Sequence, residues 1–209
     1  MTATATPPDS TDSPRRGRPG YDRETLIRVC VEVFNVHGYD ATSMGMLAKH
    51  LGISKSAIYH HVDSKEAILD HAVTDALDAL EACLDGVAGN GADAGAQVEE
   101  GIRGTLSVLV EKQPEVTLLL RLRGNSAVEL AAVERRRELT RRLGDLLEAA
   151  QATGAVRTDV TSHNLARLAL GMINSIVDWY RPGRGVPGEQ GAGKMIDAVT
   201  GVVLGGLRG

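Results

Sequence analysis

Two short helical patterns separated by a three-residue turn constrain the fold of this 209-residue chain more than any other feature of its sequence. A first helix is predicted over 44–51, where apolar residues recur three or four positions apart behind Ser43, a hydroxyl residue suited to capping. Gly52 can adopt the left-handed conformation that ends this helix. Ser54 can cap a second helix, from 55 to about 61. So short a glycine-containing connection is typical of a helix-turn-helix.

The outward side of the second helix carries donors, acceptors and cations that suit the major groove of DNA. Its N-terminal end, residues 55–57, is where base edges would be met, while Tyr59 and His61 indicate phosphate contacts, and Thr42 is a further candidate. Lys65 falls in the first turn of the following helix, beside free backbone donors that favour phosphate. We therefore predict DNA contacts from Thr42, Ser54, Lys55, Ser56, Ala57, Tyr59, His60, His61 and Lys65.

The adjacent histidines His60 and His61 do not predict a metal site. Neighbouring helical residues point about 100° apart, and no third ligand is nearby in the sequence. We expect neither a metal nor a cofactor.

The N-terminal 20 residues combine a polar, aperiodic tail with a short basic segment that contains Arg15, Arg16 and Arg18. One interpretation is a flexible arm that places guanidinium groups in an adjacent minor groove. The alternative is the end of a solubilising tail.

The segment TSMGMLAKHLGISKSAIYHHVDSKEAIL, residues 42–69, resembles the signature of TetR-type repressors in its Thr-Ser start, its "LA", its "GIS" and its "IYHH" followed by "SKE". The resemblance extends from about Gly38 to Leu69, and beyond it only length and helical layout agree. Val62 departs from the phenylalanine that is usual in the family, which affects packing alone. The resemblance implies a homodimer that binds palindromic operator DNA, and a divergent helical domain that binds an effector.

Charge is unevenly distributed along the chain, which carries a formal net charge of −4. Residues 1–65 hold 8 basic against 7 acidic residues, a net +1, and 66–209 therefore carry −5. A local basic patch, and not the sum over the chain, decides phosphate binding. No apolar stretch approaches the roughly 18 residues of a membrane-spanning helix, and no secretory signal is recognised, so we expect a cytoplasmic protein that acts at the bacterial nucleoid.

The rest of the sequence predicts helices and no strands, so the expected fold class is all-α with about nine helices. Besides a first helix that starts at 22 or 23 and stops at Gly38, helices are predicted from 63 to about 84 and over about 96–112, 114–123, 126–153, 162–181 and 192–207. We expect an arm over 1–20, a three-helix DNA-binding domain over 21–66 and a helical ligand-binding and dimerisation domain over 67–209. In the resembled family the last two long helices pair across a two-fold axis.

Two features invite a ligand-pocket interpretation. A series of arginines lies between 121 and 142; it is either a solvated face supported by neighbouring glutamates, or it turns Arg121 or Arg123 inward to bind an anion. The segment NSIVDWYRP, from Asn174, resembles regulators that sense acyl-CoA thioesters, in which arginines hold phosphates. Trp179 is either a ligand contact or a core or interface aromatic. The predicted ligand contacts are Leu118, Arg121, Leu122, Leu147, Met172, Ile173, Asn174 and Trp179.

These patterns favour a ligand-released transcriptional repressor over an enzyme or a helical protein-interaction module. No Ser/His/Asp order with supporting context and no glycine-rich phosphate loop after a strand is found in the sequence. The expected partners are double-stranded operator DNA, a small-molecule effector, such as an acyl-CoA or another apolar acid derivative, and a second copy of the chain. A protein-interaction module would not require Lys55, Tyr59 and Lys65 to point in one direction.

Overall fold

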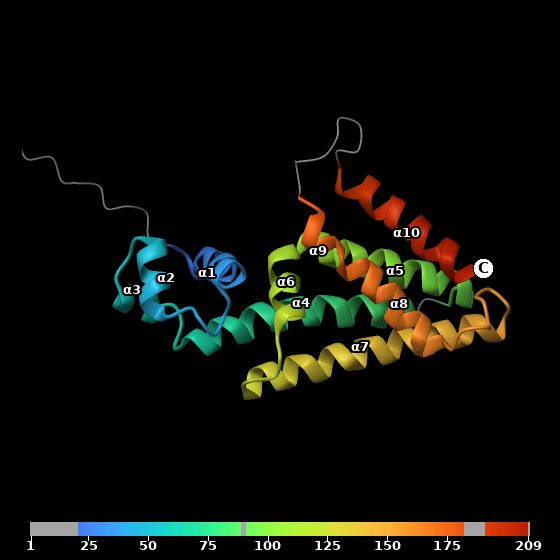
Figure 1. Ribbon diagram of the computed structural model, residues 1–209, viewed down its shortest axis with the longest axis horizontal. Coiled ribbons are helices and arrows are strands. Elements are labelled where there is room, and N and C mark those ends of the chain that lie inside the picture. The colour runs from blue at the N-terminus through green and yellow to red at the C-terminus, as the bar shows by residue number, and fades with distance from the viewer. Residues whose placement is uncertain (1–20, 89–90, 182–190, 209) are drawn as a thin grey trace, which may run out of the picture.

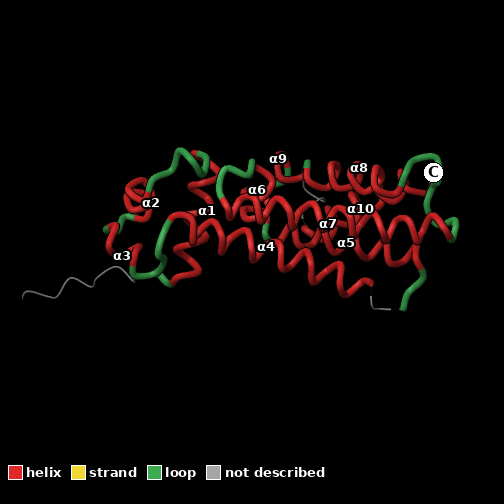
Figure 2. The backbone as a smooth tube through the Cα atoms, turned by 90° about the horizontal axis from the view of Figure 1, so that it is seen from below, coloured by secondary structure: helices red, strands yellow, loops and turns green. Residues whose placement is uncertain are grey.

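The computed structural model describes residues 21–88, 91–181 and 191–208, and within these ranges the chain forms helices and no strand. Figure 1 shows a small helical unit at one end of an elongated molecule, and α4 runs from it into a longer body of helices. Figure 2 shows the same division from below. The expected all-α class is confirmed. The basic arm with Arg15, Arg16 and Arg18 lies outside the described residues.

The helices follow the predicted order closely. They are α1 (Arg23–His37), α2 (Met44–Leu51), α3 (Lys55–Tyr59), α4 (Lys65–Ala88), α5 (Ala94–Glu111), α6 (Gln113–Arg121), α7 (Ala127–Ala152), α8 (Ser162–Asn174), α9 (Ile176–Trp179) and α10 (Ala192–Arg208). None of these helices is long and apolar enough to cross a membrane.

Side-chain caps determine where the N-terminal helices begin. The carboxylate of Asp22 accepts from the backbone N–H of Thr25, and the hydroxyls of Ser43 and Ser54 do the same for α2 and α3. Gly52 ends α2 with φ 69°, in the left-handed region. The helix-turn-helix predicted from these residue types is confirmed, although α3 ends at Tyr59, two residues earlier than expected.

One hydrophobic core joins the N-terminal helices to the body of the molecule. Leu26, Phe34, Leu47 and Ile58 from α1–α3 are buried together with residues of α4 such as Ile68. The same core continues into α6 through Leu118 and Leu119. Because burial of each large aliphatic side chain contributes roughly 1.5–3 kcal/mol, α4 and α6 fix the DNA-binding unit against the body.

The helix predicted over 162–181 is interrupted at Ser175, which separates α8 from α9 and gives ten helices in the described ranges where about nine were expected. The apolar residues that recur at helical spacing over 162–181 do not all face the core. In the structure Leu165, Ala169 and Ile176 are buried, whereas Leu168 is 65% and Trp179 55% exposed. A hydrophobic pattern at helical spacing cannot distinguish a core-facing side from one that awaits a partner surface.

The turn between α6 and α7 is organised around Glu129, a carboxylate that is only 2% exposed. One of its oxygens accepts hydrogen bonds from the backbone N–H groups of Arg123, Gly124 and Asn125 at 3.0–3.1 Å. Ser126 caps α7 by accepting from the N–H of Glu129. This extended form of a capping box satisfies donors that the turn would otherwise leave unpaired.

We therefore expect Glu129→Ala to lower the free energy of unfolding by about 2 kcal/mol, because three partly buried N–H groups lose their acceptor. Glu134→Ala, which removes an exposed carboxylate from the same helix, is the matched control and is expected to change it by less than about 0.5 kcal/mol. Urea denaturation at a fixed protein concentration measures both. Equal stability of the two variants would contradict this role of Glu129.

Candidate DNA-binding surface and effector cavity

The second helix of the helix-turn-helix presents polar side chains to solvent. Lys55, Ser56 and His60 are exposed and Tyr59 is 50% exposed, whereas Ile58 is fully buried. The side chains of Lys55, Ser56, Tyr59 and His60 therefore point away from the core that holds the helix.

Its own N-cap and contacts with α1 and α2 hold α3 in place. The hydroxyl of Ser54 accepts from the N–H of Ala57 at 3.1 Å, and Arg23 on α1 donates to the carbonyl of His61 at 3.2 Å. The alkyl stem of Lys55 passes close to Gly45 on α2, where an added Cβ would stand 3.0 Å from its Cε. Because Gly45 has no side chain, the end of the Lys55 side chain can lie against the first turn of α2.

Two of the predicted phosphate contacts have structural partners. Thr42 is 2% exposed and its hydroxyl donates to the carbonyl of Gly38 at 2.7 Å, so its prediction as a DNA contact is wrong. The Nζ of Lys65 donates to the carbonyl of Tyr39 at 2.8 Å and lies 4.2 Å from the centre of its ring. Lys65 is half-buried, so it remains in the proposed surface as a charge held in one position.

The tyrosine beneath Lys65 is itself a structural residue. Burial, followed by the nearby carboxylates of Glu66, Glu129 and Asp40, raises the pKa of Tyr39 to about 12. Its ring meets Phe34 edge-on at 5.1 Å between centroids. In the described parts of the chain, no three side chains of the metal-ligating types come together, His60 and His61 included.

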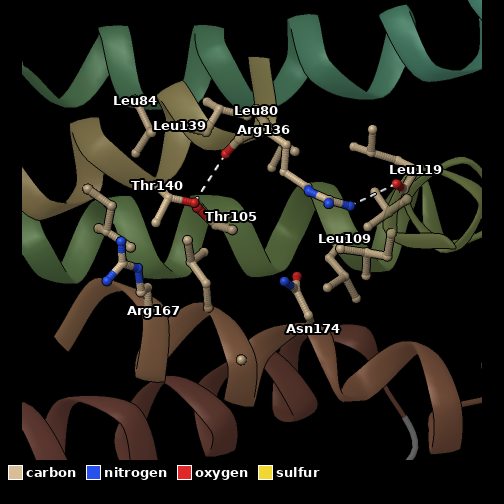
Figure 3. A pocket seen from close by; sticks show the side chains of 15 residues that line it. Leu80, Leu84, Thr105, Leu109, Leu119, Arg136, Leu139, Thr140, Arg167 and Asn174 are labelled. Atoms are coloured by element: carbon tan, nitrogen blue, oxygen red, sulfur yellow. Dashed lines mark hydrogen bonds between the residues drawn. The ribbon is translucent and has the colours of Figure 1, made fainter. Parts of the chain in front are cut away.

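The body of the molecule contains a largely apolar cavity of about 400 Å³, a size typical of small-molecule sites. Figure 3 shows its lining, contributed by α4, α5, α6, α7 and α8. Leucines form most of the wall: Leu80, Leu84, Leu109, Leu119, Leu120, Leu139, Leu143 and Leu170. The polar side chains among them are Thr105, Arg136, Thr140, Arg167 and Asn174.

Arg136 is the cation set deepest in this wall. It is half-buried, and burial, with Arg137 nearby, lowers the pKa of its guanidinium from the usual value. Its Nη1 donates to the carbonyl of Leu119 on α6 at 3.0 Å (Figure 3). No acidic side chain lines the cavity, so the positive charge of Arg136 is available to an anionic ligand.

The run of arginines around Arg136 is visible in the sequence, but which of them faces the cavity could not be predicted from it. Three arginines follow one another, and their side chains diverge around α7. Arg135 pairs with Asp78 and Glu81 of α4, and Arg137 pairs with Glu134 at 3.2 Å. Periodicity indicates that the three point apart, but only the position of α4 decides which one enters the cavity.

Of the eight predicted ligand contacts, only Asn174 lines this cavity. Leu147 and Ile173 are fully buried in the core and line no described hollow. Met172 and Trp179 face outward and line a surface hollow beside α10. The assignment of these four residues as ligand contacts therefore stays a prediction that the cavity does not support, because an inward and an outward apolar side chain look alike in sequence.

The other three predicted contacts, Leu118, Arg121 and Leu122, line a separate hollow next to the DNA-binding unit. Arg121 does not reach the cavity, because its Nη1 donates to the carbonyl of Asn35 on α1 at 2.6 Å. Of the two alternatives left open for the arginine series, an inward-pointing Arg121 or Arg123 is therefore contradicted. Both are exposed, and Arg121 joins the two parts of the molecule.

Three hydrogen bonds connect the DNA-binding unit to the segment around α6. Besides the bond from Arg121, the amide of Asn35 donates to the carbonyl of Pro114 at 2.8 Å. At the other end of the segment the amide of Asn125 donates to Asp40 at 3.1 Å. Since α6 also supplies Val116, Leu119 and Leu120 to the cavity wall, it contacts both sites directly.

Comparisons with known families cover most of the chain. Residues 26–72 match the family described as "Bacterial regulatory proteins, tetR family". Residues 91–207, more than half of the chain, match the "Tetracyclin repressor-like, C-terminal domain".

Individual proteins agree with this. The chain is 29% identical to the HTH-type transcriptional repressor KstR2 of Rhodococcus jostii (strain RHA1) over 97% of both chains. It is 49% identical to SCO3833, a TetR transcriptional regulator from Streptomyces coelicolor A3, with a TM-score of 0.80 over 88% of this chain and 92% of that one. AibR, solved with isovaleryl coenzyme A and operator DNA, shares the fold at 20% identity, with a TM-score of 0.70 over 86% and 96% of the two chains.

We expect Tyr59→Ala to weaken DNA binding by about 1 kcal/mol or more while the melting temperature stays within a few degrees, because the side chain is exposed and removed from the core. Lys55→Ala is expected to cost about 1–3 kcal/mol if its ammonium meets a guanine. Arg28→Ala, an exposed α1 variant with the same loss of charge, serves as the control. Fluorescence anisotropy with a duplex selected from a random pool measures all three, and unchanged affinity for the first two would refute the assignment.

Proposed function

The chain belongs to the TetR family of bacterial transcriptional regulators, and on this basis we propose that it is a homodimeric repressor released from a palindromic operator when a small molecule occupies the cavity. The exposed side chains of α3, chiefly Lys55, Ser56 and Tyr59, read the operator. The domain division we propose places DNA binding in 21–66 and ligand binding and dimerisation in 67–209.

The observation that carries this proposal is the position of α6 between the cavity and α1. Leu119 contributes its side chain to the cavity wall and its carbonyl to Arg136. Two residues further on, Arg121 donates a hydrogen bond to the carbonyl of Asn35, near the C-terminal end of α1 in the DNA-binding unit. A ligand that attracts Arg136 therefore competes for a hydrogen bond made by the helix on which the DNA-binding unit rests. Coupling between two such sites typically amounts to roughly 1–3 kcal/mol.

The cavity indicates the chemical class of the effector. Its wall is mostly leucine, which favours an apolar group, and Arg136 adds a cation without an acidic neighbour in the lining. An acyl-CoA thioester or another derivative of an apolar acid combines the two properties. The isovaleryl coenzyme A bound in AibR, a protein of the same fold, supports this class.

A two-fold partner is proposed on the outward face of α8, α9 and α10. There Leu168, Met172, Trp179 and Val202 are 43–65% exposed, and a hollow lies between the helices. Contiguous exposed apolar side chains of this kind mark protein interfaces. Dimerisation also provides the second recognition helix, because one short helix contacts too few base pairs for selectivity.

The molecule is proposed to act without catalysis, in the cytoplasm at the nucleoid, where its operator lies. Its described relatives are transcriptional regulators, which supports this assignment over an enzyme or a protein-interaction module. The exposed polar side chains of α3 also favour DNA as the partner.

We expect acyl-CoA thioesters of suitable chain length to weaken operator binding by about 5–150-fold at saturation. Arg136→Gln is expected to lose this response, since it keeps most of the bulk of the side chain and removes the charge that attracts an anionic ligand. Arg123→Gln, exposed and outside the cavity, is the matched control. Anisotropy titrations of the selected duplex with a series of thioesters and their free acids make the measurement. A wild-type protein whose operator affinity no compound of the series changes would contradict the proposed effector class.

We expect Leu168→Glu to give a monomer that binds the operator weakly, because the carboxylate would be buried at the two-fold interface. Leu130→Glu is the control, since Leu130 is a comparably exposed leucine in the first turn of α7, outside the proposed face. Sedimentation velocity gives the oligomeric state. A dimeric Leu168→Glu variant with normal operator affinity would exclude this face as the interface.

A further inference from the structure

A further hollow, distinct from those next to the DNA-binding unit and beside α10, opens beside the cavity on the outer side of α7 and α8. Its lining consists of Arg137, Thr140 and Arg141 from α7 and His163 and Arg167 from α8. No carboxylate and no large apolar side chain lines it. The hollow is therefore polar and basic, whereas the cavity is lined mostly by leucine.

The cavity and this outer hollow share two lining residues. Thr140 and Arg167 line both the cavity and the outer hollow. Figure 3 shows these two side chains together at one end of the cavity, while Arg136, Leu119 and Asn174 lie toward the other. A ligand that enters past Thr140 and Arg167 would thus place one part among the leucines and leave another in the basic hollow.

The basic side chains of α7 form only exposed, weak ion pairs with neighbouring glutamates. Arg137 and Arg141 pair with Glu134 at 3.2 Å, and Arg141 also pairs with Glu138 at 2.5 Å. All four of these side chains are at least 45% exposed, and exposed pairs of this kind contribute about 0–1 kcal/mol. A multiply charged ligand group can displace such glutamates.

The α8 side of the hollow is similarly arranged. The Nε2 of His163 lies 3.9 Å from Asp145, and Arg167 donates to the amide oxygen of Asn164 at 3.3 Å. Gly144 of α7 lets the ring of His163 lie against the helix, because an added Cβ would stand 3.1–3.3 Å from the ring atoms. Basic side chains from α7 and from α8 therefore flank the hollow on two sides.

We propose that the residues Arg137, Arg141, His163 and Arg167, here called the head-group groove, bind the phosphates of a coenzyme A-type head group whose acyl chain occupies the cavity. This assignment rests on the proposed function, since it takes the cavity as the effector site. Arginine forms charge-assisted, often bidentate bonds with phosphate, and several phosphates satisfy several guanidinium groups at once. α7 and α8, which carry the groove residues, belong to the helical body away from α3 (Figure 1), so the groove is separate from the DNA-reading surface.

The test compares three probes, octanoyl-CoA, octanoate and coenzyme A alone, by isothermal titration calorimetry on the full chain. We expect the double variant Arg137→Ala, Arg141→Ala to bind octanoyl-CoA and coenzyme A about tenfold more weakly and octanoate as the wild type does. The control is Arg103→Ala, Arg208→Ala, which loses the same charge from exposed positions on α5 and α10. It is expected to leave all three affinities unchanged.

Each outcome bears on the groove separately from the proposed repressor function. Equal weakening by both double variants, or wild-type affinity for octanoyl-CoA in the groove variant, would overturn the assignment. So would a wild-type protein that binds neither coenzyme A probe, or a groove variant that loses DNA affinity in the absence of any probe. If octanoyl-CoA binds through the groove but operator affinity stays constant, the groove is supported and the proposed release mechanism fails.

Discussion

The structure depends on the packing of α6, because this nine-residue helix belongs to two cores at once. Leu118 and Leu119 are buried in the core that includes the DNA-binding helices, and Val116 in the core of the helical body. A helix with large apolar side chains on two sides cannot move without disturbing both cores, since close-packed interiors have few voids to absorb a shift. The position of the DNA-binding unit and the shape of the cavity are therefore linked.

Hydrogen bonds also connect the cavity to the DNA-binding unit through α6. Arg136 reaches one carbonyl of α6 from the cavity, and Arg121 reaches from α6 to α1. The turn after α6 is held by Glu129 and returns to the DNA-binding unit through the bond from Asn125 to Asp40. In the proposed dimer, with α8 and α10 fixed at the interface, a small displacement of α6 would change the relative orientation of the two recognition helices. Operator affinity is sensitive to that orientation, because both must enter the groove of one duplex.

Residues whose effect is local were predictable from the sequence. Ser43, Gly52 and Ser54 determine helix ends through their own backbone, so the helix-turn-helix could be located without tertiary information. The cavity could not, because its lining depends on how five helices pack. Arg136 and Trp179 illustrate this: the charge faces inward and the aromatic outward, the reverse of what polarity alone suggests. The interruption at Ser175 was equally invisible, since serine is compatible with a helix.

The coupling through α6 is tested most directly by the double variant Asn35→Ala, Arg121→Ala, which removes the side-chain bonds between α1 and α6. Operator affinity would be measured with and without a saturating effector, together with effector affinity in the absence of DNA. The account predicts that the variant binds operator and effector separately, with a free energy of coupling clearly smaller than the roughly 1–3 kcal/mol expected of the wild type. A variant in which effector weakens operator binding as strongly as in the wild type would contradict it.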